Sequence, residues 1–301
     1  MHSILSSHKL LLKLAISAIL VVLILWKFPI YEIIENLRFI KISWFLLAFL
    51  LSEFVILSQA FRWHYLLIVP KEQKPNFNIL LKYTATGYFF NLLSPGGLGG
   101  DAYRSIALGK THNVIASSVA SVFVARILGL MALCLLFWIA LPYSGLVPKQ
   151  AIWFMAVATL FLLIFCLCIV FNPFNMGKLR GFTEKLKEYK KYPLRLIAAT
   201  LGSFFMQVMV VFMQVAVFKS IGISVPLAFI FAVVSVTALI TTIPISFNGI
   251  GVREWSMLSL TAYAINSEQL LASSLLAYAI VILQAVQGAI FYLMPYDRAR
   301  I

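Results

Sequence analysis

Six long apolar runs alternate with short polar segments along most of the chain. They lie at 11–28, 42–61, 114–140, 151–171, 195–218 and 269–294. An α-helix needs about 20 mostly apolar residues to cross the hydrocarbon core of a bilayer, so the pattern predicts membrane-spanning helices. The first run follows Lys9 and Lys13 without a small-residue cleavage site, so we expect a retained span there and not a removed signal peptide.

Two further apolar stretches, 77–93 and 225–243, end in interrupted sequence. Each leads into a segment rich in glycine and proline, at 94–101 and at 244–251. Backbone groups without helical hydrogen bonds cannot face lipid, because leaving them unsatisfied there is costly. We therefore expect both breaks to line a cavity or to be buried in protein.

The loops differ in their content of lysine and arginine, which indicates the orientation of the chain. The segment 172–195 is strongly basic, 62–76 carries three basic residues, and 141–150 contains only Lys149. Cytoplasmic loops are enriched in lysine and arginine. We therefore expect the first two segments and both termini to be cytoplasmic, and 141–150 to be external, in a multi-pass protein of the cell (inner, cytoplasmic) membrane.

This orientation requires an odd number of crossings between 62–76 and 141–150, and the run 114–140 supplies one. The stretch 77–112 must then enter and leave on the cytoplasmic side. By the same reasoning, 225–265 must enter and leave from outside. Both stretches are predicted to be re-entrant hairpins whose Gly/Pro breaks lie within the membrane.

The chain then divides into two halves, 11–140 and 151–294, each with the order helix, helix, re-entrant hairpin, helix. The first helices of the halves run in opposite directions, which predicts an inverted-topology repeat of the kind found in transporters. The predicted fold class is an all-α polytopic membrane protein. We expect a single membrane domain over residues 1–301, with a basic cytoplasmic loop at 172–195.

Composition agrees with this class and excludes a soluble globule. Hydrophobic residues make up 62% of the chain and charged residues 11%, whereas soluble domains carry about 25% charged residues. The net charge of +14 is explained mainly by basic cytoplasmic loops, with attraction for anionic lipid as a functional addition. No basic groove with interleaved aromatic residues indicates a nucleic acid partner.

Apolar residues also recur at helical spacing inside the basic segment. This pattern predicts an amphipathic helix lying on the inner leaflet, and its apolar positions are Leu179, Phe182, Leu186 and Tyr189. The three cysteines lie inside apolar runs and are expected to be packing residues, with no disulfide and no metal site.

Charged residues accompany both breaks and occur inside the spans. An unpaired charge at membrane depth costs about 2.5–3.5 kcal/mol, so partners or a wet cavity are expected. Guanidinium groups suit a lipid phosphate, and backbone amides at Gly97–Gly100 and Asn248–Gly251 are predicted to face an anion. The candidate substrate-binding residues are Arg62, Asn91, Gly97, Gly99, Gly100, Asp101, Arg104, Arg126, Asn248, Gly249, Gly251, Arg253 and Glu254, and Glu53 is a candidate for proton coupling.

Several of these charged residues also have an alternative, purely structural interpretation. Asp101 and Arg104 can pair along one helix face, with Asp101 as the N-cap. Glu254 can complement a helix N-terminus, and Arg62 can extend to the membrane interface. Four glutamines within the spans are expected to join helices: Gln207, Gln214, Gln284 and Gln287.

Signatures of enzymes are missing from the sequence. It contains no G-x-S-x-G or Walker motif, and its four histidines lack metal-ligand spacing. We therefore expect neither catalysis nor a cofactor nor a metal.

The two breaks resemble a known family. The first reads Asn91-x-x-x-Pro95-Gly-Gly-Leu-Gly-Gly-Asp101-x-x-Arg104, after Arg62-Trp63, and the second reads Pro244-x-x-x-Asn248-Gly-Ile-Gly-Val-Arg253-Glu254. Together they resemble the flippase-like membrane domain of lysylphosphatidylglycerol synthases, whose stand-alone members form the YbhN or UPF0104 group. The resemblance covers nearly the whole chain and implies movement of a phospholipid or lipid-linked phosphate between leaflets.

The chain departs from this family in two respects. The synthase members carry a cytoplasmic aminoacyl-transferase domain, and we expect none here because the sequence ends at Ile301 after its last span. Relatives often have Glu-Arg where this chain has Ala125-Arg126, so no role of that acid is carried over to this chain.

Three functions compete at this stage. The first is a lipid flippase or translocase that moves a phosphate-bearing phospholipid through a central arginine-lined cavity. The second is a transporter of a small anion or another solute that uses the same cavity. The third is a non-transporting membrane partner of a separate lipid-modifying enzyme.

Overall fold

The computed structural model describes residues 40–94, 96–145, 147–171, 180–246, 248–261 and 264–294, with Tyr31, Glu35, Leu37 and Arg38 before them. The predicted span 11–28 lies outside this part. Within it the chain is helical and contains no strand. Five helices are long and apolar enough to cross a membrane: α3 (Ile42–Leu66), α6 (Ile115–Ser144), α7 (Lys149–Phe171), α9 (Pro193–Ser220) and α12 (Ser267–Leu293). These observations confirm the all-α polytopic fold.

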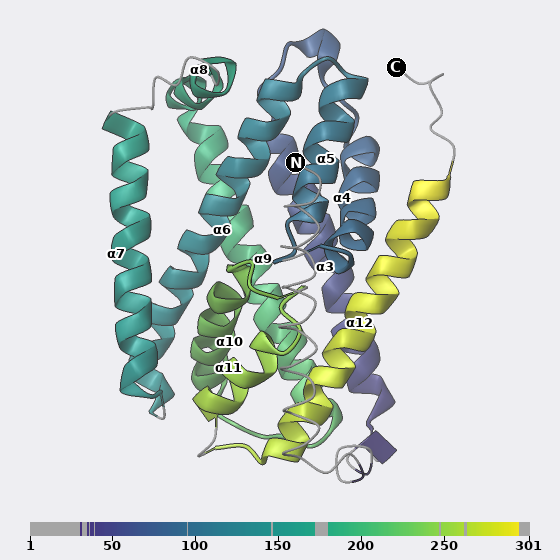
Figure 1. The fold of residues 1–301 in the computed structure, drawn as a ribbon, viewed down its shortest axis with the longest axis vertical. Helices are drawn as coiled ribbons and strands as arrows, with labels where there is room; N and C mark the ends of the chain where they lie inside the picture. Colours follow the sequence, from purple (N-terminus) through teal and green to yellow (C-terminus); the bar gives the residue numbers. More distant parts are fainter. Residues whose placement is uncertain are drawn as a thin grey trace, which may run out of the picture.

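The two interrupted stretches form two hairpins of short helices. The first hairpin is α4 (Phe77–Leu92) and α5 (Gly99–Thr111), and the second is α10 (Leu227–Thr242) and α11 (Val252–Thr261). The longest of the four has 16 residues, or about 24 Å at the usual rise, which falls short of the roughly 30 Å of hydrocarbon. The hairpins occupy opposite halves of the molecule along its long axis (Figure 1).

The tips of the two hairpins meet in the middle of the bundle. The amide of Gly96 donates to the carbonyl of Ser246 at 3.0 Å, and the amide of Asn248 donates to the carbonyl of Ser94 at 3.2 Å. At Gly96, where φ is +61°, a Cβ atom would lie 2.9 Å from Cα of Pro244. This close approach explains the glycine at that position.

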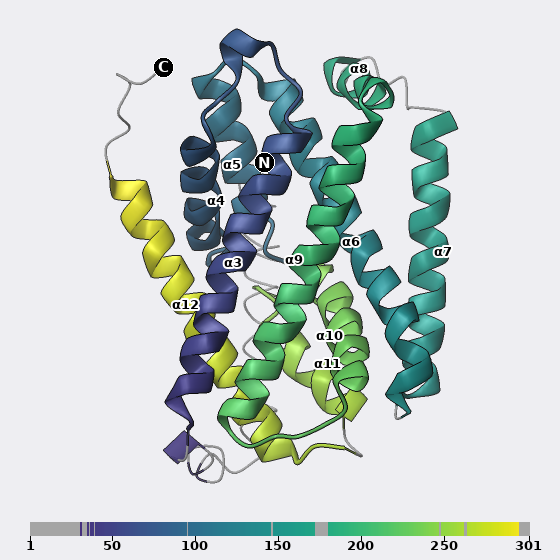
Figure 2. The same cartoon turned by 180° about the vertical axis from the view of Figure 1, so that it is seen from behind.

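The helices pack reciprocally around a central pair. α3 lies along α9, while α4 packs on α12 and α10 packs on α6 (Figure 2). Each hairpin therefore rests on the last helix of the other half of the chain. The predicted inverted repeat would produce this exchange, although the repeat itself and re-entry into a bilayer stay predictions.

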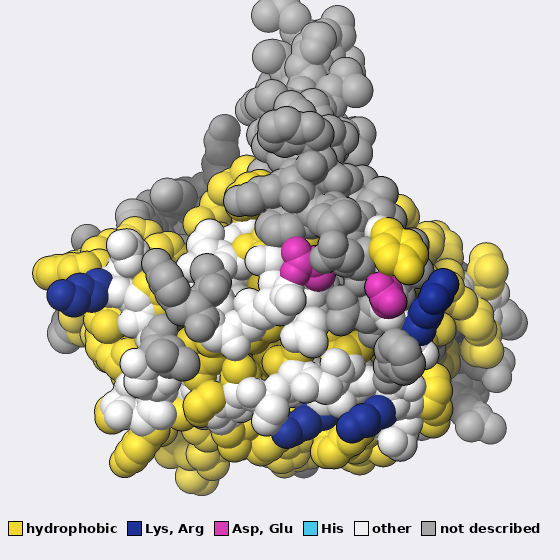
Figure 3. All heavy atoms as spheres, turned by 90° about the horizontal axis from the view of Figure 1, so that it is seen from below, with side chains coloured by type: hydrophobic (Ala, Val, Ile, Leu, Met, Phe, Trp, Pro, Cys, Tyr) yellow, Lys and Arg dark blue, Asp and Glu magenta, His cyan; other side chains and the backbone are white. Residues whose placement is uncertain are grey.

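The outer surface is apolar. Trp153, Leu160 and Phe161 on α7 are 60–73% exposed, and hydrophobic side chains line much of the rim of the end seen in Figure 3. A contiguous apolar surface of this extent marks contact with lipid and not with water. The segment 71–73, α8 and the end of α12 lie at one end of the bundle, and the turn between α6 and α7 lies at the other (Figure 1).

The predicted amphipathic helix is present as α8 (Arg180–Glu188), followed by a short turn of helix at Tyr189–Lys191. Phe182, Leu186 and the buried Tyr189 pack in a cluster with residues of α3, α6 and α9. The hydroxyl of Tyr189 donates to the carbonyl of Leu66. These apolar side chains therefore contact protein where the sequence predicted contact with the inner leaflet, and Leu179 lies outside the described residues.

Candidate functional site: a buried arginine cavity

A polar cavity of about 230 Å³ lies beside the tip of the first hairpin. Helices α3, α4, α5, α6, α9 and α10 all contribute to its wall. Its polar lining residues are Gln59, Arg62, Asn91, Asp101, Arg104, Arg126, Gln207 and Thr242, together with Gly97 at the hairpin tip. Six of the predicted site residues are thus brought together.

One carboxylate bridges two arginines in this cavity. Oδ1 of Asp101 lies 2.8 Å from Nη2 of Arg104, and Oδ2 lies 2.8 Å from Nη1 of Arg126. Arg62 approaches from α3 and donates from Nη1 to Oγ of Ser203 at 3.1 Å. Three cations and one anion leave a formal excess of two positive charges, so the cavity favours an anion.

Several guanidinium N–H groups in the cavity lack an acceptor. The side chains of Arg62 and Arg104 are buried, with 3% and 2% exposure. Nε of Arg62 and both Nε and Nη1 of Arg104 have no hydrogen-bond partner among the described residues. Buried donors without acceptors are costly, and the oxygens of a phosphate are well suited to satisfy them.

Trp63 fixes the position of Arg104 on its other side. The guanidinium carbon lies 5.3 Å from the centre of the Trp63 ring, within the range of a cation–π contact. The indole N–H of Trp63 in turn donates to Oγ of Ser121 at 2.9 Å. Arg62 is therefore one of the cavity cations, and its neighbour Trp63 supports a second one, Arg104.

The backbone amides of the glycine run have a different role from the predicted one. The amide of Gly99 donates to Oγ of Ser94, and the amide of Gly100 donates to Oδ1 of Asn91, both at 2.7 Å. The prediction that these two amides face a ligand is therefore wrong, because they close the turn between α4 and α5. Asp101 is likewise not the N-cap of α5, since it lies two residues after Gly99, where the helix begins.

Glycine at position 100 permits close packing inside the hairpin. A Cβ atom at Gly100 would collide with the carbonyl oxygen of Gly87 on α4. The conformation at Gly97, where φ is +63°, brings the chain round before α5 starts. These glycines thus serve the approach of two helices, which places Asp101 and Arg104 at the cavity.

The charged residues after the second break lie in a separate polar cluster. Nη2 of Arg253 donates to Oε1 of Gln214 on α9 at 2.9 Å, and its guanidinium lies 5.8 Å from the ring centre of Tyr278 on α12. Oε2 of Glu254 accepts hydrogen bonds from the amide of Gly251 at 2.8 Å and from the hydroxyl of Tyr278 at 3.2 Å. Glu254 thus caps α11, and neither residue lines the arginine cavity.

The other predicted residues also lie outside that cavity. Oδ1 of Asn248 and the tip glycine Gly97 are close neighbours, and Asn248 and Gly249 have φ values of 45° and 77°, which suit the tight turn before α11. Glu53 accepts a hydrogen bond from Nε2 of Gln287 at 3.0 Å. It lines a different, mostly apolar groove of about 270 Å³ between α3, α4 and α12.

Sequence reasoning missed several polar partners. Ser203 and Gln59 were not singled out, nor was Tyr278, which contacts both charged residues of the second cluster. Gln207 and Gln284 were expected to join helices, and each donates to a backbone carbonyl of a neighbouring helix, Gly129 or Ser52. The seven-residue spacing of Gln207 and Gln214 places both side chains on one face of α9. This spacing could have indicated that α9 turns a polar face toward α6 and Arg253.

Apolar helices of spanning length around buried, partly unsatisfied arginines define a multi-pass helical membrane protein. The sequence model of a family described as the lysylphosphatidylglycerol synthase TM region matches residues 10–287, and the chain belongs to this family. It is 29% identical over 187 residues to the UPF0104 membrane protein MJ1078 of Methanocaldococcus jannaschii, which covers 56% of this chain and 77% of the relative. The resemblance seen in the two break motifs is thereby confirmed.

Proposed function

We propose that this protein is a lipid flippase that moves an anionic, phosphate-bearing lipid between leaflets through the arginine cavity. The carrying observation is the excess positive charge around Asp101, together with the unpaired N–H groups of Arg62 and Arg104. A phosphate monoester or diester supplies several acceptor oxygens and the matching charge. The family description names a phospholipid whose headgroup contains a phosphate diester, which supports a phosphate-bearing lipid as cargo.

The hairpins suggest how a headgroup is given a polar route through the bilayer. In this proposal α4–α5 dips into the membrane from the cytoplasm and α10–α11 dips from outside, as two halves of an inverted repeat. Their tips meet at mid-height, next to the cavity. A headgroup at this depth would contact arginines while its acyl chains stay in lipid. The termini lie in the cytoplasm, and the protein resides in the cell membrane.

The proposal contains no chemical step and no cofactor. Movement down a lipid gradient needs no further energy. Glu53 is half-buried beside Gln287, and its Oε1 atom has no hydrogen-bond partner among the described residues; it is the candidate for coupling to protons. A separate lipid-modifying enzyme is the expected partner.

A lipid-scrambling assay in liposomes tests the proposal. Arg104→Gln and Arg62→Gln should each slow the movement of a fluorescent anionic phospholipid by about 10- to 100-fold, because one charge-assisted contact to phosphate is lost. Lys149→Gln, an exposed charge change at the end of α7, is the matched control. Unchanged lipid movement in both arginine variants, with intact thermal unfolding, would refute the assignment. Anion flux without lipid movement would identify a small-anion transporter.

A further inference from the structure

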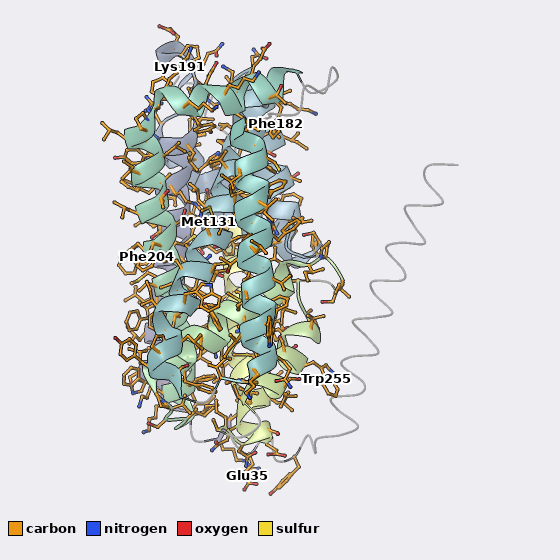
Figure 4. All side chains as sticks on the ribbon, turned by 90° about the vertical axis from the view of Figure 1, so that its left-hand side faces the viewer. Glu35, Met131, Phe182, Lys191, Phe204 and Trp255 are labelled. Atoms are coloured by element: carbon orange, nitrogen blue, oxygen red, sulfur yellow. The ribbon has the colours of Figure 1, made fainter. Side chains whose placement is uncertain are left out.

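A second cavity, of about 220 Å³, lies between α6, α7, α9 and the amphipathic helix α8. Figure 4 shows α8 lying across the upper end of the bundle, with Met131 of α6 below it. The cavity shares no lining residue with the arginine cavity. Its wall is almost entirely aliphatic, aromatic or sulfur-containing and includes Val124, Ile127, Leu128, Met131, Cys166 and Ile169.

The end of this cavity next to α8 is cationic. Lys187 and Lys190 both line it there and are exposed. The hydroxyl of Tyr189, between them in sequence, is directed to the carbonyl of Leu66. The cavity therefore combines an apolar body with positive charge at one end, which is complementary to an amphiphile with an acyl chain and an anionic headgroup.

The cavity is partly open, and α7 forms one of its walls. α7 packs mainly on α6, and its outer face carries the exposed residues Trp153, Leu160 and Phe161. Cys166 and Ile169 of α7 and Leu196 of α9 line the cavity from two sides. An apolar cavity gains dispersion contacts when an acyl chain fills it, and its apolar wall offers few partners to water.

We propose that this cavity binds one anionic phospholipid, with an acyl chain between α6 and α7 and the phosphate at Lys187 and Lys190. The bound lipid would join the peripheral helix α7 to the rest of the bundle. The proposal depends on the membrane class of the protein and not on transport. Its test can therefore fail while the flippase assignment stands, and the reverse also holds.

Photolabelling of the full-length protein in phosphatidylcholine vesicles tests this site. The probe is phosphatidic acid with a photoactivatable group in the acyl chain, and mass spectrometry locates the adducts. We expect adducts on 123–131 of α6 and on Cys166 or Ile169 of α7. Lys187→Gln and Lys190→Gln should each lower this labelling roughly fivefold, since a lysine near an anionic headgroup contributes about that factor.

Two further variants separate charge from shape. Lys191→Gln removes a neighbouring charge that does not line the cavity, and it should leave labelling nearly unchanged. Met131→Trp fills the cavity without altering charge, and it should abolish labelling while the lysines remain. Equal labelling by a phosphatidylcholine probe, or labelling insensitive to both lysine variants, would overturn the proposal. Protein–protein adducts at the same residues would also overturn it, by assigning the cavity to a partner helix.

Discussion

Asp101 on α5 and Arg126 on α6 lie 2.8 Å apart, between Oδ2 and Nη1, although 25 positions separate them in the sequence. The same carboxylate binds Arg104 through its other oxygen. Asp101 therefore attaches the first hairpin to α6 and at the same time limits the repulsion between two arginines. It has a structural role that the cavity requires before any ligand arrives.

Asp101→Asn should destabilise the protein more than a typical surface change does. Two cations would lose their carboxylate in a largely buried setting, at a cost of about 3 kcal/mol in the free energy of unfolding. Thermal unfolding in detergent measures the loss. The double variant Asp101→Asn with Arg104→Gln should recover part of it, and strict additivity of the two single effects would contradict a direct interaction.

Gly100→Ala should disrupt the first hairpin. The new methyl group would collide with the carbonyl of Gly87, and overpacking of this kind costs about 1–3 kcal/mol. The matched control is Gly181→Ala in α8, where the nearest atom, Cβ of Ala116, is 3.7 Å away. The control should be neutral or slightly stabilising. Equal unfolding temperatures for the two variants would contradict the close approach of α4 and α5.

Glu254→Ala and Glu254→Gln should behave differently. Alanine removes the acceptor for the Gly251 amide and for Tyr278, at a cost of about 1–2 kcal/mol. Glutamine keeps an acceptor oxygen and should preserve most of the stability. Hydrogen exchange at the start of α11 resolves the difference, and similar exchange in both variants would point to a role for the charge and not for the cap.

Tyr189→Phe should loosen α8. The hydrogen bond to the carbonyl of Leu66 would be lost, at about 1 kcal/mol. Tyr192→Phe, at a more exposed position, is the control. Faster hydrogen exchange in 180–188, seen in Tyr189→Phe alone, is the expected result.

The same contact predicts a pH dependence. Burial, and secondarily the charge of Glu188, raise the pKa of Tyr189 above its ordinary value. A raised folded-state pKa means that the stabilisation is fully present below the unfolded pKa of about 10 and is lost progressively at higher pH. Wild-type protein should therefore lose more stability above pH 10 than Tyr189→Phe does.

Much of the fold was predictable because a bilayer restricts the alternatives. The long apolar runs gave α6, α7, α9 and α12 to within about four residues at each end. The end of α3 was placed five residues too early, at 61 in place of Leu66, because Arg62 suggested the membrane surface. Arg62 instead lies within the helix and is buried, where it donates a hydrogen bond to Ser203 and lines the cavity.

The site was predictable in its residue types and less so in its geometry. Charge and glycine at the first break identified Asp101 and Arg104 as neighbours of a cavity, and a charge inside an apolar span identified Arg126. Sequence does not specify side-chain direction, so Arg253 was expected there, whereas it points to Gln214 and Tyr278. The glycine amides were assigned to a ligand because the sequence does not show that the side chains of Ser94 and Asn91 fold back to accept from them.

The paired hydrogen bonds between Ser94 and Asn248 and between Gly96 and Ser246 have a mechanical consequence. They join the two loops directly, so neither loop can shift alone without breaking these backbone hydrogen bonds. Any motion that exposes the arginines first to one face and then to the other would have to carry both loops as one body. Such a motion would change the contacts between the joined loops and the helices around them.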